Sequence, residues 1–151
     1  YSHSDPITNY GHNNQSIGHQ WGGNFGEFLA IARYHKDRFF ADAKFTVGVR
    51  GFDFADSGAN SNYGGNIYRD YDEERFANSG VKVGQGNKTD FFMADIQGGY
   101  LINPSTNLKL FASYIFRDFN PMQNTATAFN ESTNWFSIGI RSDVFNWYFD
   151  Y

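Results

Sequence analysis

The fold is decided by the stretch Ala41-Asp42-Ala43-Lys44-Phe45-Thr46-Val47-Gly48-Val49-Arg50-Gly51-Phe52. Its odd positions from 41 to 49 hold Ala, Ala, Phe, Val and Val, whereas its even positions from 42 to 50 hold Asp, Lys, Thr, Gly and Arg. Successive side chains of a β-strand point to opposite faces of the sheet, so this order separates an apolar face from a polar one. The stretch therefore predicts a strand with one apolar face.

Four further segments alternate in the same way. They are residues 27–35, 92–101, 108–117 and 135–141. No stretch shows a convincing helical period. The sequence therefore predicts an all-β, antiparallel chain with about five strands.

Composition narrows the class of protein further. The 151 residues suit one domain, and aromatic residues make up 20% of them although the hydrophobic share is only 40%. So many rings exclude intrinsic disorder, and the absence of Cys excludes disulfide scaffolds and Cys-ligated zinc. A net charge of -4 offers no basic surface for nucleic acid.

The connections between the predicted strands alternate in length. Residues 36–39 and 103–107 are short turns, whereas residues 53–90 and 119–133 are long loops, and residues 1–20 would complete another loop. If the short turns share one end of the sheet, the long loops share the other. That asymmetry is typical of an outer-membrane β-barrel with periplasmic turns and extracellular loops.

The two ends of the chain agree with a barrel fragment. The sequence starts at Tyr1 without Met, as a mature product or a fragment would. It stops at Phe149-Asp150-Tyr151, an aromatic end that resembles the C-terminal signal of bacterial outer-membrane proteins. Five strands are too few to close, since membrane-spanning barrels have at least eight. We therefore expect the C-terminal portion of a larger transmembrane barrel. A soluble β-sandwich lectin is the alternative, because alternation alone does not separate the two.

A short glycine-rich segment carries a family resemblance. Residues 14–24, Asn-Gln-Ser-Ile-Gly-His-Gln-Trp-Gly-Gly-Asn, precede a long amphipathic strand. This pattern resembles capsule-assembly proteins of the Wzi type and their relatives in Bacteroidota, some of which are associated with gliding motility. The resemblance implies a non-enzymatic barrel in the bacterial outer membrane with a polar, occluded lumen.

The same resemblance implies what the protein would contact. Its expected partners are outer-membrane lipid, surface polysaccharide during capsule assembly or retention, and other outer-membrane proteins. An accessory subunit of a surface motility or secretion complex is a second candidate. The sequence predicts neither a cofactor nor a catalytic residue, since it holds no nucleotide loop, nucleophile elbow or HExxH motif.

Charged residues mark the predicted inner face of the barrel. Charges of both signs can pair across strands in a polar lumen, whereas charge is costly on a lipid-facing surface. This set would either form ion pairs that stiffen the barrel or line a path for an anionic glycan. It consists of Glu27, Arg33, Asp42, Lys44, Arg50, Asp95, Lys109, Arg117 and Arg141.

A second set of candidates lies in the predicted external loops. Rings stack on sugar faces and amides pair with sugar hydroxyls, although loop Asn and Gly residues also simply form turns. Instead of binding a glycan or a partner, His19 could form a side-chain hydrogen bond to the backbone that holds the bend at Gly22-Gly23. The candidate glycan or partner-binding residues are His19, Tyr63, Asn66, Tyr68, Tyr71 and Asp72.

Metal binding has weaker support in the sequence. His3, His12 and His19 are spaced by nine and seven residues, which matches no compact ligand motif. The acidic run at residues 70–74 has calcium-binding residue types, but a solvated external loop explains it more simply. We therefore predict no metal site.

Overall fold

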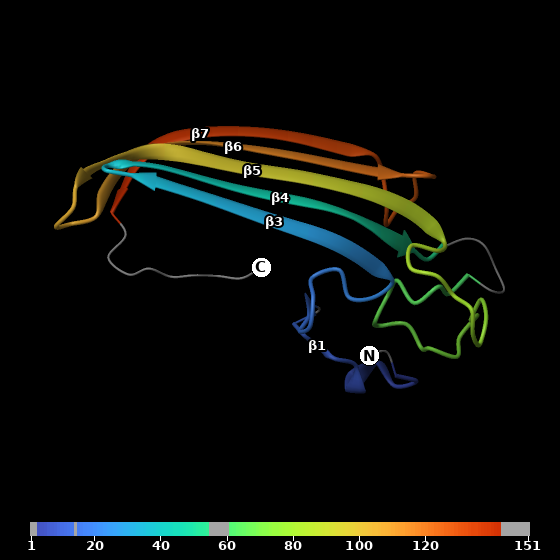
Figure 1. Ribbon diagram of the computed structural model, residues 1–151. Coiled ribbons are helices and arrows are strands. Elements are labelled where there is room, and N and C mark those ends of the chain that lie inside the picture. Colours follow the sequence, from blue (N-terminus) through green and yellow to red (C-terminus); the bar gives the residue numbers. More distant parts are fainter. Residues whose placement is uncertain (1–2, 14, 55–60, 143–151) are drawn as a thin grey trace. The chain divides into compact units, whose positions relative to one another are not determined.

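The computed structural model describes residues 3–13, 15–54 and 61–142, and these form an antiparallel all-β structure. One sheet contains five strands in the order β3 (Phe25–Lys36), β4 (Phe39–Phe52), β5 (Asn87–Asn103), β6 (Leu108–Pro121) and β7 (Glu131–Ser142) (Figure 1). The predicted all-β class is confirmed. Among the described residues, no helix is long and apolar enough to cross a membrane.

The predicted loops differ from the observed ones at their bounds. Residues 87–90 and 119–121 continue β5 and β6, and residues 131–133 belong to β7. Alternation did not reveal the start of β5, because Asn87 and Thr89 are polar yet fully buried. The predicted first loop also contains secondary structure, with a 3-10 turn η1 (Pro6–Thr8) and a small antiparallel sheet of β1 (Gly11–His12) and β2 (Gln15–Ser16).

Two side-chain contacts between strands agree with an apolar and a polar face of the sheet. Phe39 and Tyr100 meet on the apolar face, with ring centroids 5.1 Å apart. On the opposite, polar face, the hydroxyl oxygens of Ser113 and Ser137 lie 2.6 Å apart. The alternation read from the sequence therefore describes the two faces of this sheet correctly.

Aromatic rings cover glycines on the polar face. A Cβ atom added to Gly48 would lie 3.1 Å from the Trp21 ring, and one added to Gly99 would lie 2.6 Å from the Phe40 ring. Gly139 has the same relation to Phe111, at 3.3 Å. These glycines leave room for rings to lie flat against strands, which is a known way to stabilise glycine in a sheet.

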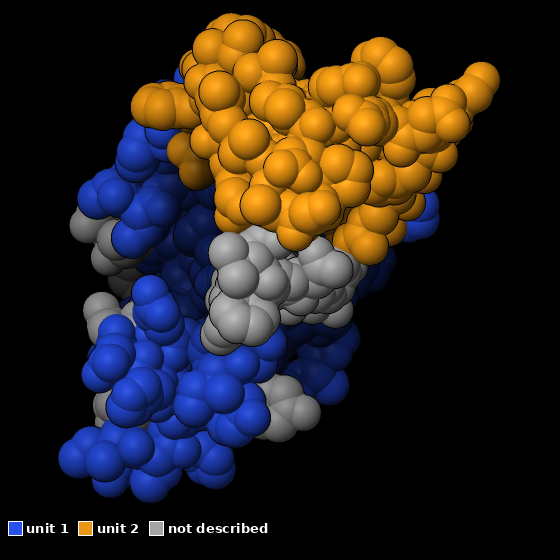
Figure 2. Space-filling model, turned by 90° about the vertical axis from the view of Figure 1, so that its left-hand side faces the viewer, with its two compact units in different colours: residues 1–28, 47–92, 118–132 blue, residues 29–46, 93–117, 133–151 orange. Residues whose placement is uncertain are grey.

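The chain divides into two compact units (Figure 2). Unit 1 comprises residues 1–28, 47–92 and 118–132, and unit 2 comprises residues 29–46, 93–117 and 133–151. Their charges differ in sign. Among the described residues, unit 1 holds ten acidic and five Lys or Arg residues, whereas unit 2 holds three acidic and seven Lys or Arg residues.

Candidate functional site

The apolar face of unit 2 is largely open. In β7, Phe136, Ile138 and Ile140 are 68%, 69% and 64% exposed, and Tyr34 in β3 is 59% exposed. The described part of unit 2 is a single layer of strands with two short turns, so it has no second layer of its own to cover these side chains. An apolar surface of this kind marks a contact with lipid or with another protein layer.

The polar face of unit 2 is better covered. The Arg141 guanidinium lies 5.2 Å from the centroid of the Phe111 ring, and the Lys109 ammonium lies 5.5 Å from that of Phe40. Arg117 donates a 3.4 Å hydrogen bond to the Thr133 hydroxyl. Cations on this face therefore contact rings and hydroxyl groups.

On that face, the predicted lumen residues include more positively than negatively charged side chains. In unit 2, five of them are Lys or Arg and two are Asp. By strand alternation they share one side of the sheet. The cations are Arg33, Lys44, Lys109, Arg117 and Arg141, and the carboxylates are Asp42 and Asp95.

An aromatic cluster covers the polar face of unit 1. Trp21 is 9% exposed and meets Phe25 and Phe91 edge to face, with ring centroids 5.5 and 4.9 Å away. Phe119 contacts Phe91 at 6.3 Å and Phe52 at 5.8 Å. These rings join the first loop to the ends of β3, β4, β5 and β6 in a small hydrophobic core.

His19 lies at the edge of this cluster. Its ring stacks on Phe25 at 4.3 Å, its Nδ1 accepts a 3.2 Å hydrogen bond from the Trp21 amide, and its Nε2 lies 2.9 Å from Glu27 Oε1. One tautomer, with the proton on Nε2, satisfies both polar contacts. A backbone-holding role was the predicted alternative for His19, and the bond to Trp21 is of that kind, one residue before Gly22-Gly23.

Asn24 is a hydrogen-bonding hub, meaning that its side chain joins separate backbone segments, and the sequence did not predict it. Its side-chain amide donates to the carbonyls of Gly51 (3.1 Å) and Gln85 (2.8 Å) and accepts from the amide of Gly84 (2.9 Å). Its own carbonyl accepts a 2.9 Å bond from the Gly51 amide, and its φ is 54°. Asn tolerates this left-handed conformation better than most residues do, so the residue type suits both roles.

A network of charges fixes the long loop to the end of β4. Arg69 pairs with Glu74 and donates a 3.1 Å hydrogen bond to the Ser61 hydroxyl, and its Nη1 lies 3.9 Å from Asp53 Oδ2. Asp53 Oδ1 accepts a 2.8 Å bond from the Tyr63 amide. The predicted ion pairs were among lumen residues, whereas these pairs lie in the long loop and involve other residues.

Arg50 is the predicted lumen residue that reaches this network. Its Nη2 donates to the Gly65 carbonyl at 3.2 Å, and its guanidinium lies 4.3 Å from the centroid of Phe52. Burial lowers the pKa of Arg50, and the Asp53 carboxylate opposes that change. Arg50 thus holds the loop against the strand end.

The loop itself is organised around Asn62, which is 7% exposed. Its side-chain amide donates to the carbonyls of Asp70 (2.9 Å) and Glu73 (3.0 Å) and accepts from the Gly64 amide (3.0 Å). Every polar atom of this buried side chain therefore has a partner, as a stable buried amide requires.

The predicted binding residues of the loop separate into two groups. Tyr63 stacks on Phe76 at 4.7 Å, and the Tyr68 ring packs against Gly11, so both rings are half-buried by contacts within unit 1. Three others are accessible, namely Asn66, Tyr71 and Asp72. The structure thus brings only part of the predicted set to the surface.

The accessible residues have simple local contacts. Asn66 caps a turn through a 2.9 Å bond from the Tyr68 amide, and Arg75 contacts both the Tyr71 ring (5.2 Å) and the Asp72 carboxylate (3.5 Å). His3, His12 and His19 form no metal-binding group, and the part of the chain that the structure describes contains no cluster of three metal-ligating side chains.

Comparisons with known proteins give no further assignment. No family model, no curated protein and no solved structure matches this chain.

Asn24→Asp tests the hub. The substitution removes the donors to Gly51 and Gln85 and places a carboxylate beside their carbonyl oxygens, so we expect a loss of about 2 kcal/mol of local stability. Hydrogen exchange at the Gly51 amide, which donates to the Asn24 carbonyl, should accelerate correspondingly. Asn66→Asp is the matched control, since that side chain acts only as an acceptor in its turn and should leave the exchange at Gly51 unchanged. Equal effects of the two changes would contradict the hub.

Proposed function

We propose that this chain forms part of the wall of an outer-membrane β-barrel. The observation that carries the proposal is the apolar face of the single-layer sheet in unit 2, where large apolar side chains are more than half exposed on β3 and β7. In a barrel, this face meets lipid while the polar face with its Lys and Arg residues meets the lumen. The part of each strand in unit 2 is then the membrane-spanning part.

The strand edges support closure by further strands. β3 and β7 each have one neighbour in the sheet, and an unpaired edge exposes backbone hydrogen-bonding groups that cannot remain open in lipid. A membrane barrel has at least eight strands, so strands beyond these five complete it. Exposed apolar side chains on the polar face of these two edge strands agree with further strands that would cover them. They are Leu29, Ile31 and Trp135, which are 40%, 45% and 63% exposed.

The barrel acts without catalysis and associates with surface polysaccharide. Support comes from the Wzi-like pattern of residues 14–24 and from Asn66, Tyr71 and Asp72, which offer an amide, a ring and a carboxylate at the surface of the long loop. In this role, unit 1 presents the binding surface and unit 2 anchors it.

Two substitutions on β7 test the lipid contact. Phe136 and Trp135 are neighbours of similar exposure, 68% and 63%, on opposite faces. Phe136→Arg places a charge in lipid and should lower the free energy of unfolding from the membrane by about 2 kcal/mol or more near the bilayer centre. Trp135→Arg places the charge on the polar face and should cost clearly less.

The measurement is urea-induced unfolding of the full-length protein in lipid vesicles. A cost for Trp135→Arg equal to or above that for Phe136→Arg would contradict the assignment of the two faces.

Tyr71→Ala tests the polysaccharide contact. A ring that stacks on sugars loses that contact on truncation, so we expect at least a fivefold loss in binding of the polysaccharide extracted from the native cell surface, equivalent to about 1 kcal/mol. Surface plasmon resonance with immobilised protein measures it. Tyr10→Ala, which removes another exposed tyrosine of unit 1, should leave binding unchanged. Unaltered binding in Tyr71→Ala would remove this loop from the contact.

A further inference from the structure

The two ring nitrogens of His19 have opposite hydrogen-bonding roles. Nδ1 accepts a 3.2 Å hydrogen bond from the Trp21 amide, and Nε2 lies 2.9 Å from Glu27 Oε1. An ionised carboxylate only accepts hydrogen bonds, so Nε2 has to carry the ring proton. Nδ1 can accept from the Trp21 amide only while it has no proton of its own. The contacts of His19 therefore require a neutral ring.

A second proton on the ring would change only one of these contacts. It would bind to Nδ1, so that an N–H group of the ring would face the N–H group of Trp21, and two donors do not bond. The bond from Nε2 to Glu27 would instead become charge-assisted and stronger. Turning the ring over would not restore the lost bond, since both nitrogens of an imidazolium are donors. The protonated ring therefore keeps Glu27 and releases the Trp21 amide.

The surroundings of His19 favour this exchange of contacts. The first loop contributes the uncharged amide and ring of Trp21, whose ring centroid lies 5.7 Å away. Strand β3 contributes the charged Glu27 carboxylate and the uncharged Phe25 ring, which is stacked on His19 and would also attract a cationic ring. The side chains of His19 and Glu27 are 32% and 25% exposed, so protons reach the ring from solvent.

The Trp21 amide belongs to a bend that packs tightly against the long loop. The Gly23 amide donates a 3.0 Å hydrogen bond to the Trp21 carbonyl. A Cβ atom added to Gly23 would lie 2.5 Å from the Gly64 carbonyl oxygen, and one added to Gly22 would lie 3.0 Å from Ile67 Cγ2. A bend packed this closely cannot shift without changing its contact with the long loop.

We propose that His19 is a pH-sensitive joint between the first loop, residues 3–13 and 15–24, and the long loop at residues 61–86. The neutral ring holds the Trp21 amide in place, and the protonated ring releases it and loosens the contact of the bend with Gly64 and Ile67. A histidine changes its charge between about pH 5 and pH 8, so mild acidification is sufficient. This inference goes beyond the proposed function and does not depend on it, because the joint lies within unit 1 and needs neither lipid nor polysaccharide.

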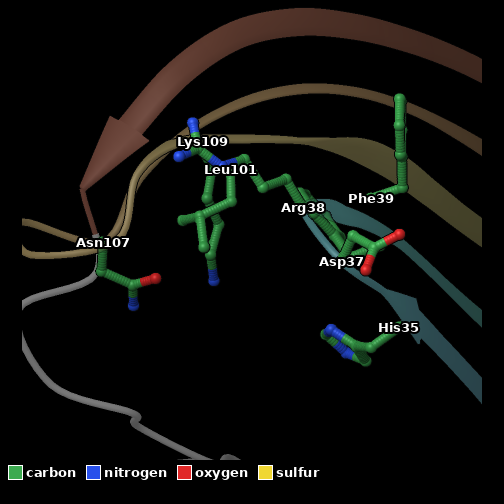
Figure 3. A pocket seen from close by; sticks show the side chains of 8 residues that line it. His35, Asp37, Arg38, Phe39, Leu101, Asn107 and Lys109 are labelled. Atoms are coloured by element: carbon green, nitrogen blue, oxygen red, sulfur yellow. The ribbon is translucent and has the colours of Figure 1, made fainter.

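His35 offers a comparison within the same chain. It belongs to unit 2, where it lines a pocket of about 260 Å³ at the two short turns (Figure 3). Its ring stacks on Phe40 at 6.3 Å, but its nitrogens have no hydrogen-bond partner among the residues that the structure describes. Protonation of His35 therefore breaks no bond to the described backbone.

The first measurement is nitrogen NMR of the full-length protein in detergent, with ¹⁵N in the histidine rings. At about pH 7.5, we expect a proton on Nε2 and none on Nδ1 of His19, whereas His35 should show an average of the two tautomers. His19→Asn identifies the His19 signals by removing them. A proton on Nδ1 of His19 at this pH would overturn the proposal.

The second measurement is hydrogen exchange at the Trp21 amide, expressed as protection relative to the unfolded chain at the same pH. Between about pH 7.5 and about pH 5, we expect protection to fall roughly tenfold, since one hydrogen bond is lost. Protection of the Gly64 amide, across the contact, should also fall. The Met122 amide, which donates a 2.9 Å bond to the Lys88 carbonyl in the same unit, should keep its protection.

Two variants assign the effect to His19. In His19→Asn, the side-chain oxygen can replace Nδ1 as acceptor and does not titrate. Whatever its protection, the Trp21 amide of this variant should no longer respond to pH. His35→Asn is the matched control and should respond as the unchanged chain does. Equal protection of the Trp21 amide at the two pH values in the unchanged chain would overturn the proposal, and so would a pH response that persists in His19→Asn.

Discussion

The rest of the structure depends on the need to remove one face of a five-stranded sheet from water. Phe136, Ile138 and Ile140 in β7 leave most of their surface open, and each large apolar side chain gains about 1.5–3 kcal/mol when it is fully buried. A sheet can satisfy this constraint against a second layer or against lipid. The proposed barrel uses lipid, which needs no protein partner along the whole apolar face.

The opposite face is stabilised by different means. Rings lie over Gly48, Gly99 and Gly139, and cations lie beside Phe40 and Phe111. A glycine in a strand has no side chain to pack, which weakens the strand. In these pairs the aromatic ring packs against the glycine and supplies the missing contact. A polar face with cations and hydroxyl groups is compatible with the polar interior of the proposed barrel.

The two units differ in charge and in the connections that they contain. Unit 1 is acidic and contains the long loops, whereas unit 2 is basic and contains both short turns. In the proposed barrel, the cations of unit 2 belong to the polar lumen face, and the proposed polysaccharide contact is on the long loop of unit 1.

The strands were predictable because their alternation is local. Residues 41–52 alone separate the two faces, and the predicted turns at 36–39 and 103–107 contain the observed turns, although Lys36, Phe39 and Asn103 belong to strands. The start of β5 was hidden because Asn87 is polar but bonds to the backbone amide and carbonyl of Gln123, 36 residues away. The alternation of polar and apolar residues cannot show that a polar side chain is buried in a strand when its hydrogen-bond partner lies in another loop.

The loop contacts were less predictable for the same reason. Asn24 joins residues 27 and 61 positions away, and nothing near it in the sequence names those partners. Tyr63 and Tyr68 were predicted to be exposed rings by residue type, yet contacts with Phe76 and Gly11 leave them half-buried. Only its position after Gly22-Gly23 and the tolerance of Asn for positive φ could have singled out Asn24.

The most direct test of the central claim is spin-label accessibility along β7. The chain has no cysteine, so single cysteines at positions 134–140 can be labelled cleanly in the full-length protein in lipid vesicles. If the apolar face of the sheet meets lipid, labels at even positions will collide with dissolved oxygen and be shielded from a water-soluble nickel complex, while labels at odd positions will not follow that pattern. Even positions that are shielded from both reagents would mean a protein core, and even positions open to nickel would mean water. Either result would contradict a lipid-facing sheet.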